Sequence, residues 1–190
     1  MEQNGIEGKI FTGKDFVKNS LPKGEYERCT FTECMFADGD LSTIRFIECE
    51  FQRCDMSNIN LKGTGVREIN FIDCKLVGAH FEQCDKLLSS LHFENCILNL
   101  SSFFRVNIKK TMFKNCSLQE ADFTESDLTG AVFDRCDLAR AVFKNTVLEK
   151  TDFRTAYNYS IDPEINRIKK AKFTLNGIAG LLDKYDVLIE

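Results

Sequence analysis

Nine cysteines are the residues of this sequence with the most evident capacity for chemistry, either as metal ligands or as disulfide partners. Eight of them fall into sets with a regular spacing of 20 in the sequence: Cys34, Cys54 and Cys74; Cys96, Cys116 and Cys136; Cys29 and Cys49. Structural zinc sites use paired ligands only about two to four residues apart, so these spacings do not indicate a metal. An odd number of cysteines leaves any disulfide framework incomplete. We predict that the cysteines are small apolar fillers of a core, with no bound metal or cofactor.

The two histidines, His80 and His92, are the next candidates for catalysis or metal binding. Each directly precedes a large apolar residue that we assign to the core below, so each side chain is expected to face solvent. The sequence shows no second ligand for either histidine, no nucleophile–base set and no glycine-rich phosphate loop. We therefore predict that the protein is not an enzyme.

The elements that position these residues follow from a period of five, which is clearest in ADFTESDLTGAVFDRCDLARAVFKN at 121–145. Large apolar residues recur there at Phe123, Leu128, Phe133, Leu138 and Phe143, each preceded by a small residue two places earlier. An α-helix rotates by about 100° per residue and a strand alternates its faces, so neither keeps this period on one side. The period works only if the chain turns one corner per unit, which builds a solenoid.

The repeat continues through roughly residues 9–155, with one slip of two extra residues near Cys84–Lys86. The spacing of 20 indicates four sides per coil, so about seven coils would form a rod of roughly 34 Å. Residues at this spacing should stack in inner columns. These columns include Phe93, Phe113, Phe133 and Phe153; Leu98, Leu118 and Leu138; and Leu88, Ile108, Leu128 and Leu148.

Charged residues also recur at a spacing of 20 and alternate in sign. The sets are Glu33, Arg53 and Asp73; Lys114, Asp134 and Arg154; and Glu120 and Arg140. Because opposite charges on neighbouring rungs attract, these sets predict ion pairs between coils.

The units ADFTE, SDLTG, AVFDR, CDLAR and AVFKN resemble the A(D/N)LXX unit of pentapeptide-repeat proteins. The resemblance implies an all-β solenoid, a right-handed quadrilateral β-helix in which the large and the small residue of each unit are both buried. It is much more specific for fold than for function.

After Phe153 the sequence predicts a short α-helical cap. Asp162 followed by Pro163 is typical of a helix start, so we expect a helical turn through about Ile168. Residues 171–173 return to the repeat as a last partial coil. A second helix is expected from Gly177 to about 185, and a closing strand over 187–189. We thus assign residues 1–160 to the β-helix, with a register break near 82–88, and residues 161–190 to a cap and dimerisation segment.

A cap is needed because the last coil exposes apolar side chains and unpaired backbone groups. The predicted helix and strand leave an apolar face and a strand edge available to a second copy. The predicted dimer interface consists of Ile178, Leu181, Leu182, Tyr185, Val187 and Ile189.

The tail segments IDPEINRI and GLLDKYDVLI resemble the C-terminal end of a bacterial topoisomerase-protecting group, the Qnr quinolone-resistance proteins, MfpA and the microcin immunity protein. This resemblance implies a rod-shaped dimer that binds DNA gyrase or topoisomerase IV and protects it from poisons, partly by DNA mimicry. It implies no direct contact with nucleic acid. The alternative is a generic cytosolic pentapeptide-repeat scaffold with an unidentified protein partner.

The charge balance sets a condition on mimicry. The chain has 29 acidic and 25 basic residues, a net charge of −4. Duplex DNA carries one negative charge per about 1.7 Å, so a rod of this length would need about 20 to match it. Mimicry therefore requires an acidic stripe on one side.

The sequence also predicts where the protein works. The N-terminal MEQNGIEGKIF lacks a basic start followed by an apolar run, and no stretch approaches the about 18 apolar residues of a membrane span. We expect a cytoplasmic protein that makes no contact with a membrane.

Overall fold

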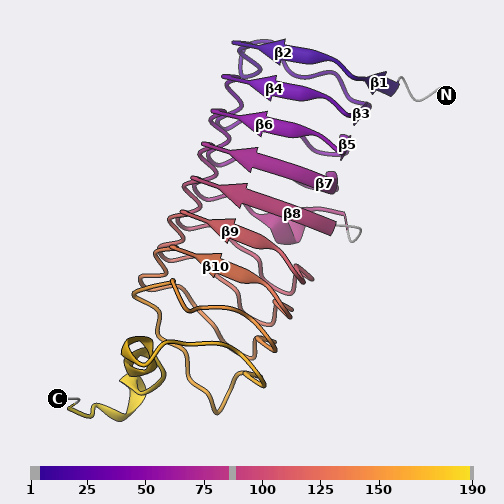
Figure 1. The fold of residues 1–190 in the computed structure, drawn as a ribbon. Helices are drawn as coiled ribbons and strands as arrows, with labels where there is room; N and C mark the ends of the chain where they lie inside the picture. The colour runs from indigo at the N-terminus through magenta and orange to yellow at the C-terminus, as the bar shows by residue number, and fades with distance from the viewer. Residues whose placement is uncertain (1–4, 86–88, 189–190) are drawn as a thin grey trace.

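The computed structural model describes residues 5–85 and 89–188 and shows a parallel β-solenoid. The chain winds from the N-terminus at one end of a rod to the C-terminus at the other, with the strands of successive coils side by side (Figure 1). The predicted all-β solenoid is confirmed.

Ten short strands form one sheet within the described ranges. They are β1 (Gly5–Glu7), β2 (Ile10–Thr12), β3 (Glu25–Glu27), β4 (Thr30–Thr32), β5 (Arg45–Ile47), β6 (Glu50–Gln52), β7 (Gly65–Ile72), β8 (Ser89–Glu94), β9 (Met112–Lys114) and β10 (Val132–Asp134). One face carries β2, β4, β6, β7, β8, β9 and β10, and a second carries β1, β3, β5 and β7. The long strand β7 turns a corner and therefore belongs to both faces, and β8 begins on the second face, where Ser89 pairs with Arg67.

Isolated parallel bridges hold the remaining sides of the coil. One continuous column of bridges joins Asp15, Met35, Asp55, Lys75, Ile97, Ser117, Asp137 and Tyr157. Every described coil is thus bonded to its neighbours on more than one side, which makes the rod a closed prism.

Most corners are formed by a residue in the left-handed conformation, two places after the large residue of its unit. Asn115 has φ 52°, Arg135 has φ 53°, and glycine takes the same place at Gly130 with φ 71°. A side chain here costs roughly 1–2 kcal/mol, which hydrogen bonds between coils offset, such as that from Asn115 N to Asp134 O at 2.8 Å. This bend at every fifth residue is why the large residues all point inward.

The predicted phenylalanine column is confirmed. The rings of Phe93, Phe113, Phe133 and Phe153 stack with centroids 5.1, 4.9 and 5.0 Å apart. The stack begins at Phe11 and continues through Phe31, Phe51 and Phe71 to this set, then on to Phe173. Leu98, Leu118 and Leu138 are also fully buried, as are Leu128 and Leu148.

The register slip leaves the core continuous. It follows the 3₁₀ turn η1 (Phe81–Gln83). Phe71 pairs with Phe51 of the coil before it at the regular spacing of 20, but with Phe93 of the next coil at a spacing of 22. The rings of Phe71 and Phe93 nevertheless remain stacked, with an interplanar angle of 7°. Lys86 and Leu88, which the sequence placed at the slip and in a column, lie outside the described residues.

The helical turn predicted from Asp162 to Ile168 is wrong. Asp162 does accept a hydrogen bond from Glu164 N (2.9 Å), as a capping residue would, but only a turn follows. Arg167 then pairs with Val147 of the coil before it. Pairing with that coil satisfies backbone groups that a single isolated helical turn would leave open.

The solenoid consequently continues beyond the predicted boundary at residue 160. Lys172 pairs with Asp152, and Phe173 stacks on Phe153 at 5.4 Å. The last partial coil predicted at residues 171–173 is confirmed.

The second predicted α-helix is instead two short 3₁₀ helices, η2 (Asn176–Leu181) and η3 (Asp183–Tyr185). Their bonds span three residues, for example from Leu182 N to Ala179 O at 2.8 Å. Glycine disfavours an α-helix, and this segment has Gly177 and Gly180 pressed against Tyr159. The predicted closing strand is also wrong, because residues 187–188 have no regular structure and Ile189 lies outside the described residues.

Candidate interaction surfaces

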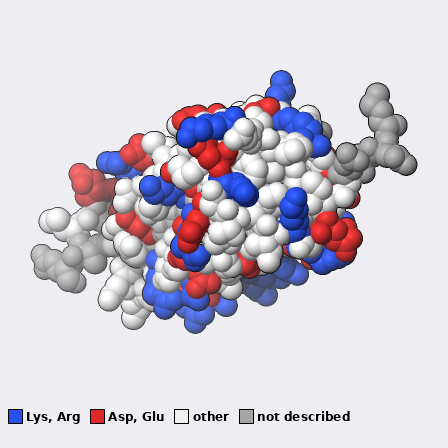
Figure 2. Space-filling model, turned by 90° about the horizontal axis from the view of Figure 1, so that it is seen from above, with Lys and Arg blue, Asp and Glu red and all other residues white. Residues whose placement is uncertain are grey.

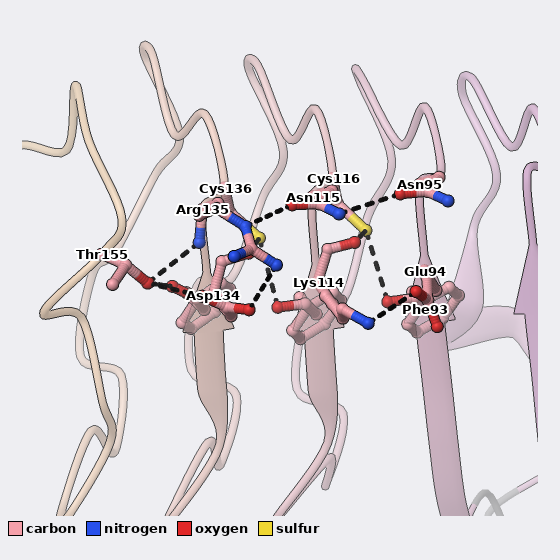
Figure 3. A network of polar contacts seen from close by, with 12 residues as sticks. Phe93, Glu94, Asn95, Lys114, Asn115, Cys116, Asp134, Arg135, Cys136 and Thr155 are labelled. Atoms are coloured by element: carbon pink, nitrogen blue, oxygen red, sulfur yellow. Dashed lines mark hydrogen bonds and ion pairs between the residues drawn. The ribbon is translucent and has the colours of Figure 1, made fainter.

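Six cysteines form one inner column of the solenoid: Cys34, Cys54, Cys74, Cys96, Cys116 and Cys136. All six are buried, and their thiols are free. Each thiol lies near a backbone carbonyl of the coil before it; Cys116 Sγ, for example, donates to Phe93 O at 3.5 Å (Figure 3). These six cysteines therefore occupy the buried positions that were predicted for small apolar core residues.

Burial makes the thiols of Cys34, Cys49 and Cys84 poor nucleophiles. Desolvation raises the pKa of Cys49 to about 11 and that of Cys34 above its usual range. Cys84, the least buried of the nine, has its pKa raised to about 12 by the same cause, reinforced by Glu82. Because the thiolate is the reactive form, none of these three residues is poised for covalent chemistry near neutral pH.

The histidines lie on the outside, as expected. His80 Nδ1 is 2.8 Å from Glu82 Oε1, and His92 Nε2 is 3.7 Å from Glu94 Oε2. Across residues 5–85 and 89–188, no three histidine, cysteine, aspartate or glutamate side chains converge as metal ligands would.

A polar ladder follows the corner next to the face of β8, β9 and β10 (Figure 3). Asn115 Nδ2 donates to Asn95 Oδ1 (3.0 Å), and Arg135 Nε donates to Asn115 Oδ1 (2.6 Å). Asn95 Nδ2 donates in turn to Asp73 Oδ1 at 3.0 Å. The ladder joins four coils through their corner side chains, so it contributes to the rod as well as to its surface.

The charged columns form ion pairs only in part as predicted. Arg53 Nε lies 3.0 Å from Glu33 Oε1, and Arg140 pairs with Glu120. Neighbours on the same coil change the column of Lys114, Asp134 and Arg154, because Asp134 pairs with Arg135, and Arg154 pairs with Asp152 at 2.8 Å.

Lys114 contacts Glu94 of the coil before it at 2.7 Å, rather than Asp134 of the next. Positive and negative side chains are interspersed over the face shown in Figure 2, with basic ones gathered along its lower edge. That face shows no continuous acidic stripe.

The residues predicted for dimerisation lie in and after the two 3₁₀ helices. Ile178, Tyr185 and Val187 have 40–52% of their surface exposed. Leu182 is half-buried, and Leu181 packs against the hydrophobic core. The sequence reasoning did not select Leu175 and Leu188, which are 87% and 94% exposed. Whether an apolar side chain in the tail is this exposed depends on how the tail folds back on the last coil. No local sequence pattern therefore predicts it.

The cap closes the rod around Tyr159. The backbone of Gly180 accepts a hydrogen bond from Ile161 N at 2.8 Å. A methyl group on Gly177 would lie 2.1 Å from Tyr159 Oη, and one on Gly180 would lie 2.2 Å from Tyr159 O. A hollow of about 560 Å³ remains between η2 and the last coil. It is lined by Asn158, Asp183 and their neighbours. It is open to solvent and brings together no catalytic set.

Closed sides and a buried apolar core leave the outer surface of the solenoid for contacts with other molecules. The family model for the pentapeptide repeat region matches residues 25–86 and 78–153. The chain belongs to the pentapeptide-repeat family.

Two solved structures of a plasmid-mediated fluoroquinolone resistance protein share the fold. Trypsin-treated QnrB1 carrying R167E is 16% identical, with a TM-score of 0.64 over 98% of this chain and 100% of that one. Full-length QnrB1 is 15% identical, with a TM-score of 0.55 over 97% and 100%. At this identity the likeness concerns the fold alone. No curated protein matches the sequence. In the described parts of the chain, no helix has the length and apolar character needed to cross a bilayer.

Proposed function

We propose that this chain is a non-enzymatic, Qnr-like protein that binds and protects a type II DNA topoisomerase, DNA gyrase or topoisomerase IV, in the cytoplasm. The observation that carries the proposal is a likeness in fold to trypsin-treated QnrB1 that covers 98% of this chain and 100% of that one. QnrB1 is described as a fluoroquinolone resistance protein, and fluoroquinolones act on these enzymes. The tail segments described above add a second point of likeness.

The free thiols support the proposed location. Nine cysteines without a disulfide fit a reducing compartment, because disulfides form and persist in oxidising ones.

Mimicry of DNA in this chain has to come from shape more than from charge. The exposed acids Glu33, Glu120 and Glu125 are each paired with an arginine of a neighbouring coil. Such pairs lower the net potential that an enzyme surface would sense. We therefore assign the proposed contact to the prism of stacked coils, with charge complementarity limited to short stretches.

A gyrase supercoiling assay tests the proposal. The purified chain, added at micromolar concentration, should relieve the inhibition caused by a fluoroquinolone without altering supercoiling in the absence of drug. Unfolded protein at equal concentration is the control. Absence of relief, together with failure to capture gyrase or topoisomerase IV from a bacterial lysate, would contradict the proposal.

The second candidate is a cytosolic scaffold for a different protein partner. The ion pairing between coils favours it, since acids that are paired with bases of neighbouring coils give the rod little reason to compete with DNA. In the same lysate experiment, one dominant partner other than a topoisomerase would support this alternative.

A further inference from the structure

Lysines gather at one corner of the last coils. The residues two places after Ile108, Leu128, Leu148 and Ile168 are Lys110, Gly130, Lys150 and Lys170. All four have φ between 59° and 71°, so they occupy the same corner of successive coils. With their neighbours they form what we call the basic corner: Lys109, Lys110, Lys150, Lys169, Lys170 and Lys172. Every one of these side chains is exposed.

The acids beside the basic corner are already neutralised. Asp127 pairs with Lys109 at 3.1 Å, and Glu149 pairs with Arg167 at 2.6 Å. Asp152 lies between two bases, 2.8 Å from Arg154 and 3.6 Å from Lys172.

Four lysines of the basic corner keep their charge uncompensated. Among the described residues, Lys110, Lys150, Lys169 and Lys170 form no ion pair. This local excess of positive charge stands on a chain whose net charge is −4.

The lysines of the basic corner form a continuous row, and repulsion between them destabilises the free protein. A methyl group at Gly130 would lie 3.7 Å from Lys110 Cγ, so the stem of Lys110 extends over the one position without a side chain. Lys150 and Lys170 are like charges on adjacent coils, which destabilises the free protein. A linear anion lying along the corner would reverse that cost.

We propose that the basic corner binds the phosphate backbone of duplex nucleic acid without reading its sequence. Lys110 and Lys170 are three coil steps apart, roughly 14 Å at about 4.8 Å per step. One strand of a duplex places a phosphate about every 3.4 Å along its axis, so this length meets about four phosphates. Lysine binds phosphate as a flexible point charge and needs no fixed geometry, which suits side chains on a convex edge.

Other occupants fit the corner less well. Lysine is depleted in protein–protein interfaces, and the column holds no aromatic or aliphatic anchor. Single-stranded nucleic acid needs aromatic side chains for stacking, which the column also lacks. A membrane surface needs apolar side chains to insert, and a rod edge offers it only a line of charge.

The inference departs from the sequence-based expectation of no contact with nucleic acid. It stands independently of the proposed topoisomerase partner. Lys110, Lys150 and Lys170 are separated in the sequence by one or two whole coils, so only the coil length brings these three lysines to one corner.

Fluorescence anisotropy with a labelled DNA duplex of random sequence, about 20 bp long, tests the proposal. We expect wild-type protein to bind, with a slope of log K against log salt of about −3.6 for four phosphates. The variant K110Q/K150Q/K170Q should lose at least about tenfold in affinity at about 50 mM salt, and up to about 2.7 of the slope. The control K14Q/K62Q/K144Q removes the same charge from exposed lysines elsewhere and should bind like wild type. Circular dichroism melts establish that both variants are folded.

Three results would overturn the proposal. The first is no binding of the duplex by wild-type protein at about 50 mM salt. The second is an equal loss in both triple variants, which would show an effect of net charge alone. The third is binding of phosphatidylserine vesicles or of poly-glutamate without binding of DNA, which would assign the corner to a membrane or to an acidic protein.

Discussion

The ring of Phe113 lies directly over the ring of Phe133, 4.9 Å away and tilted by only 2°. Each ring also meets an edge of the adjacent column, as Phe123 does against Phe133 at 5.8 Å and 83°. Stacked and edge-on contacts of this kind each add about 0.5–1.5 kcal/mol to the burial of a ring. A phenylalanine in this column therefore packs against rings above and below it along the rod, and against a ring of the adjacent column.

Replacing Phe133 tests that packing. Phe133→Ala should lower the free energy of unfolding by about 3–5 kcal/mol, because it removes a fully buried ring between two others. Phe133→Asp should prevent folding, since it buries an unpaired carboxylate in a domain of marginal stability. Urea unfolding followed by circular dichroism measures both. Val132→Thr, on the adjacent outward position, should stay within about 0.5 kcal/mol of wild type. Equal stability of Phe133→Ala and Val132→Thr would contradict the column argument.

The cap offers a second test at Gly180. Gly180→Ala places a methyl group 2.2 Å from Tyr159 O, which the backbone can relieve only by shifting the helix. We expect a loss of about 1–3 kcal/mol, and a melting transition that starts at the C-terminal coil. Gly5→Ala meets nothing within 4 Å and serves as the control. Unchanged stability of Gly180→Ala would show that the cap does not hold this contact in solution.

Tyr159 itself should be tolerant of losing its hydroxyl. Its Oη is buried and finds no hydrogen-bond partner among the described residues, and burial raises the pKa of the phenol. Tyr159→Phe should therefore keep or raise stability, by up to about 1–3 kcal/mol, because an unsatisfied polar group is removed. Differential scanning calorimetry can resolve this change. A clear loss of stability would indicate a partner for the hydroxyl in the free protein.

The sequence predicted the coil because its information is periodic. Phe93, Phe113 and Phe133 must share a side once the chain turns every five residues, and they do. The tail escaped prediction for the opposite reason. The 3₁₀ form of η2 depends on the contact of Gly177 and Gly180 with Tyr159, which lies about one coil earlier in the chain. A local pattern of capping and apolar spacing cannot register such a contact.

Ion pairs on the surface could be predicted only where the spacing of 20 residues alone decides which side chains meet. Glu33 and Arg53 pair as their spacing indicated. Arg154 instead pairs with Asp152, two residues away on the same coil, because a near partner costs less side-chain freedom than one on the next coil. The basic corner required both the coil length and the position of every nearby acid, and so it emerged only from the structure.

The buried thiol of Cys49 predicts a loss of stability at high pH. The pKa of Cys49 is raised to about 11 in the folded protein, against about 8.5 for an unfolded chain. Its contribution is complete below about pH 8.5 and is lost as the pH rises through about 11, because the unfolded state releases the proton more readily. Over that window wild-type protein should lose up to about 1.4 kcal/mol per pH unit more than Cys49→Ala. Ile44→Val, buried and non-titrating, should keep the wild-type slope. Parallel slopes for wild type and Cys49→Ala would contradict the assignment.

The tail is expected to pair two copies of the chain. Leu182 lies half-buried between η2 and η3, beside the exposed side chains of Ile178 and Tyr185. Leu182→Asp should leave the circular dichroism spectrum unchanged and convert a dimer to a monomer in light scattering, because an aspartate in an apolar interface loses its hydration. Leu175→Asp changes an exposed leucine outside the predicted interface and should remain dimeric. A monomeric wild-type protein, or dimers that survive Leu182→Asp, would exclude this use of the tail.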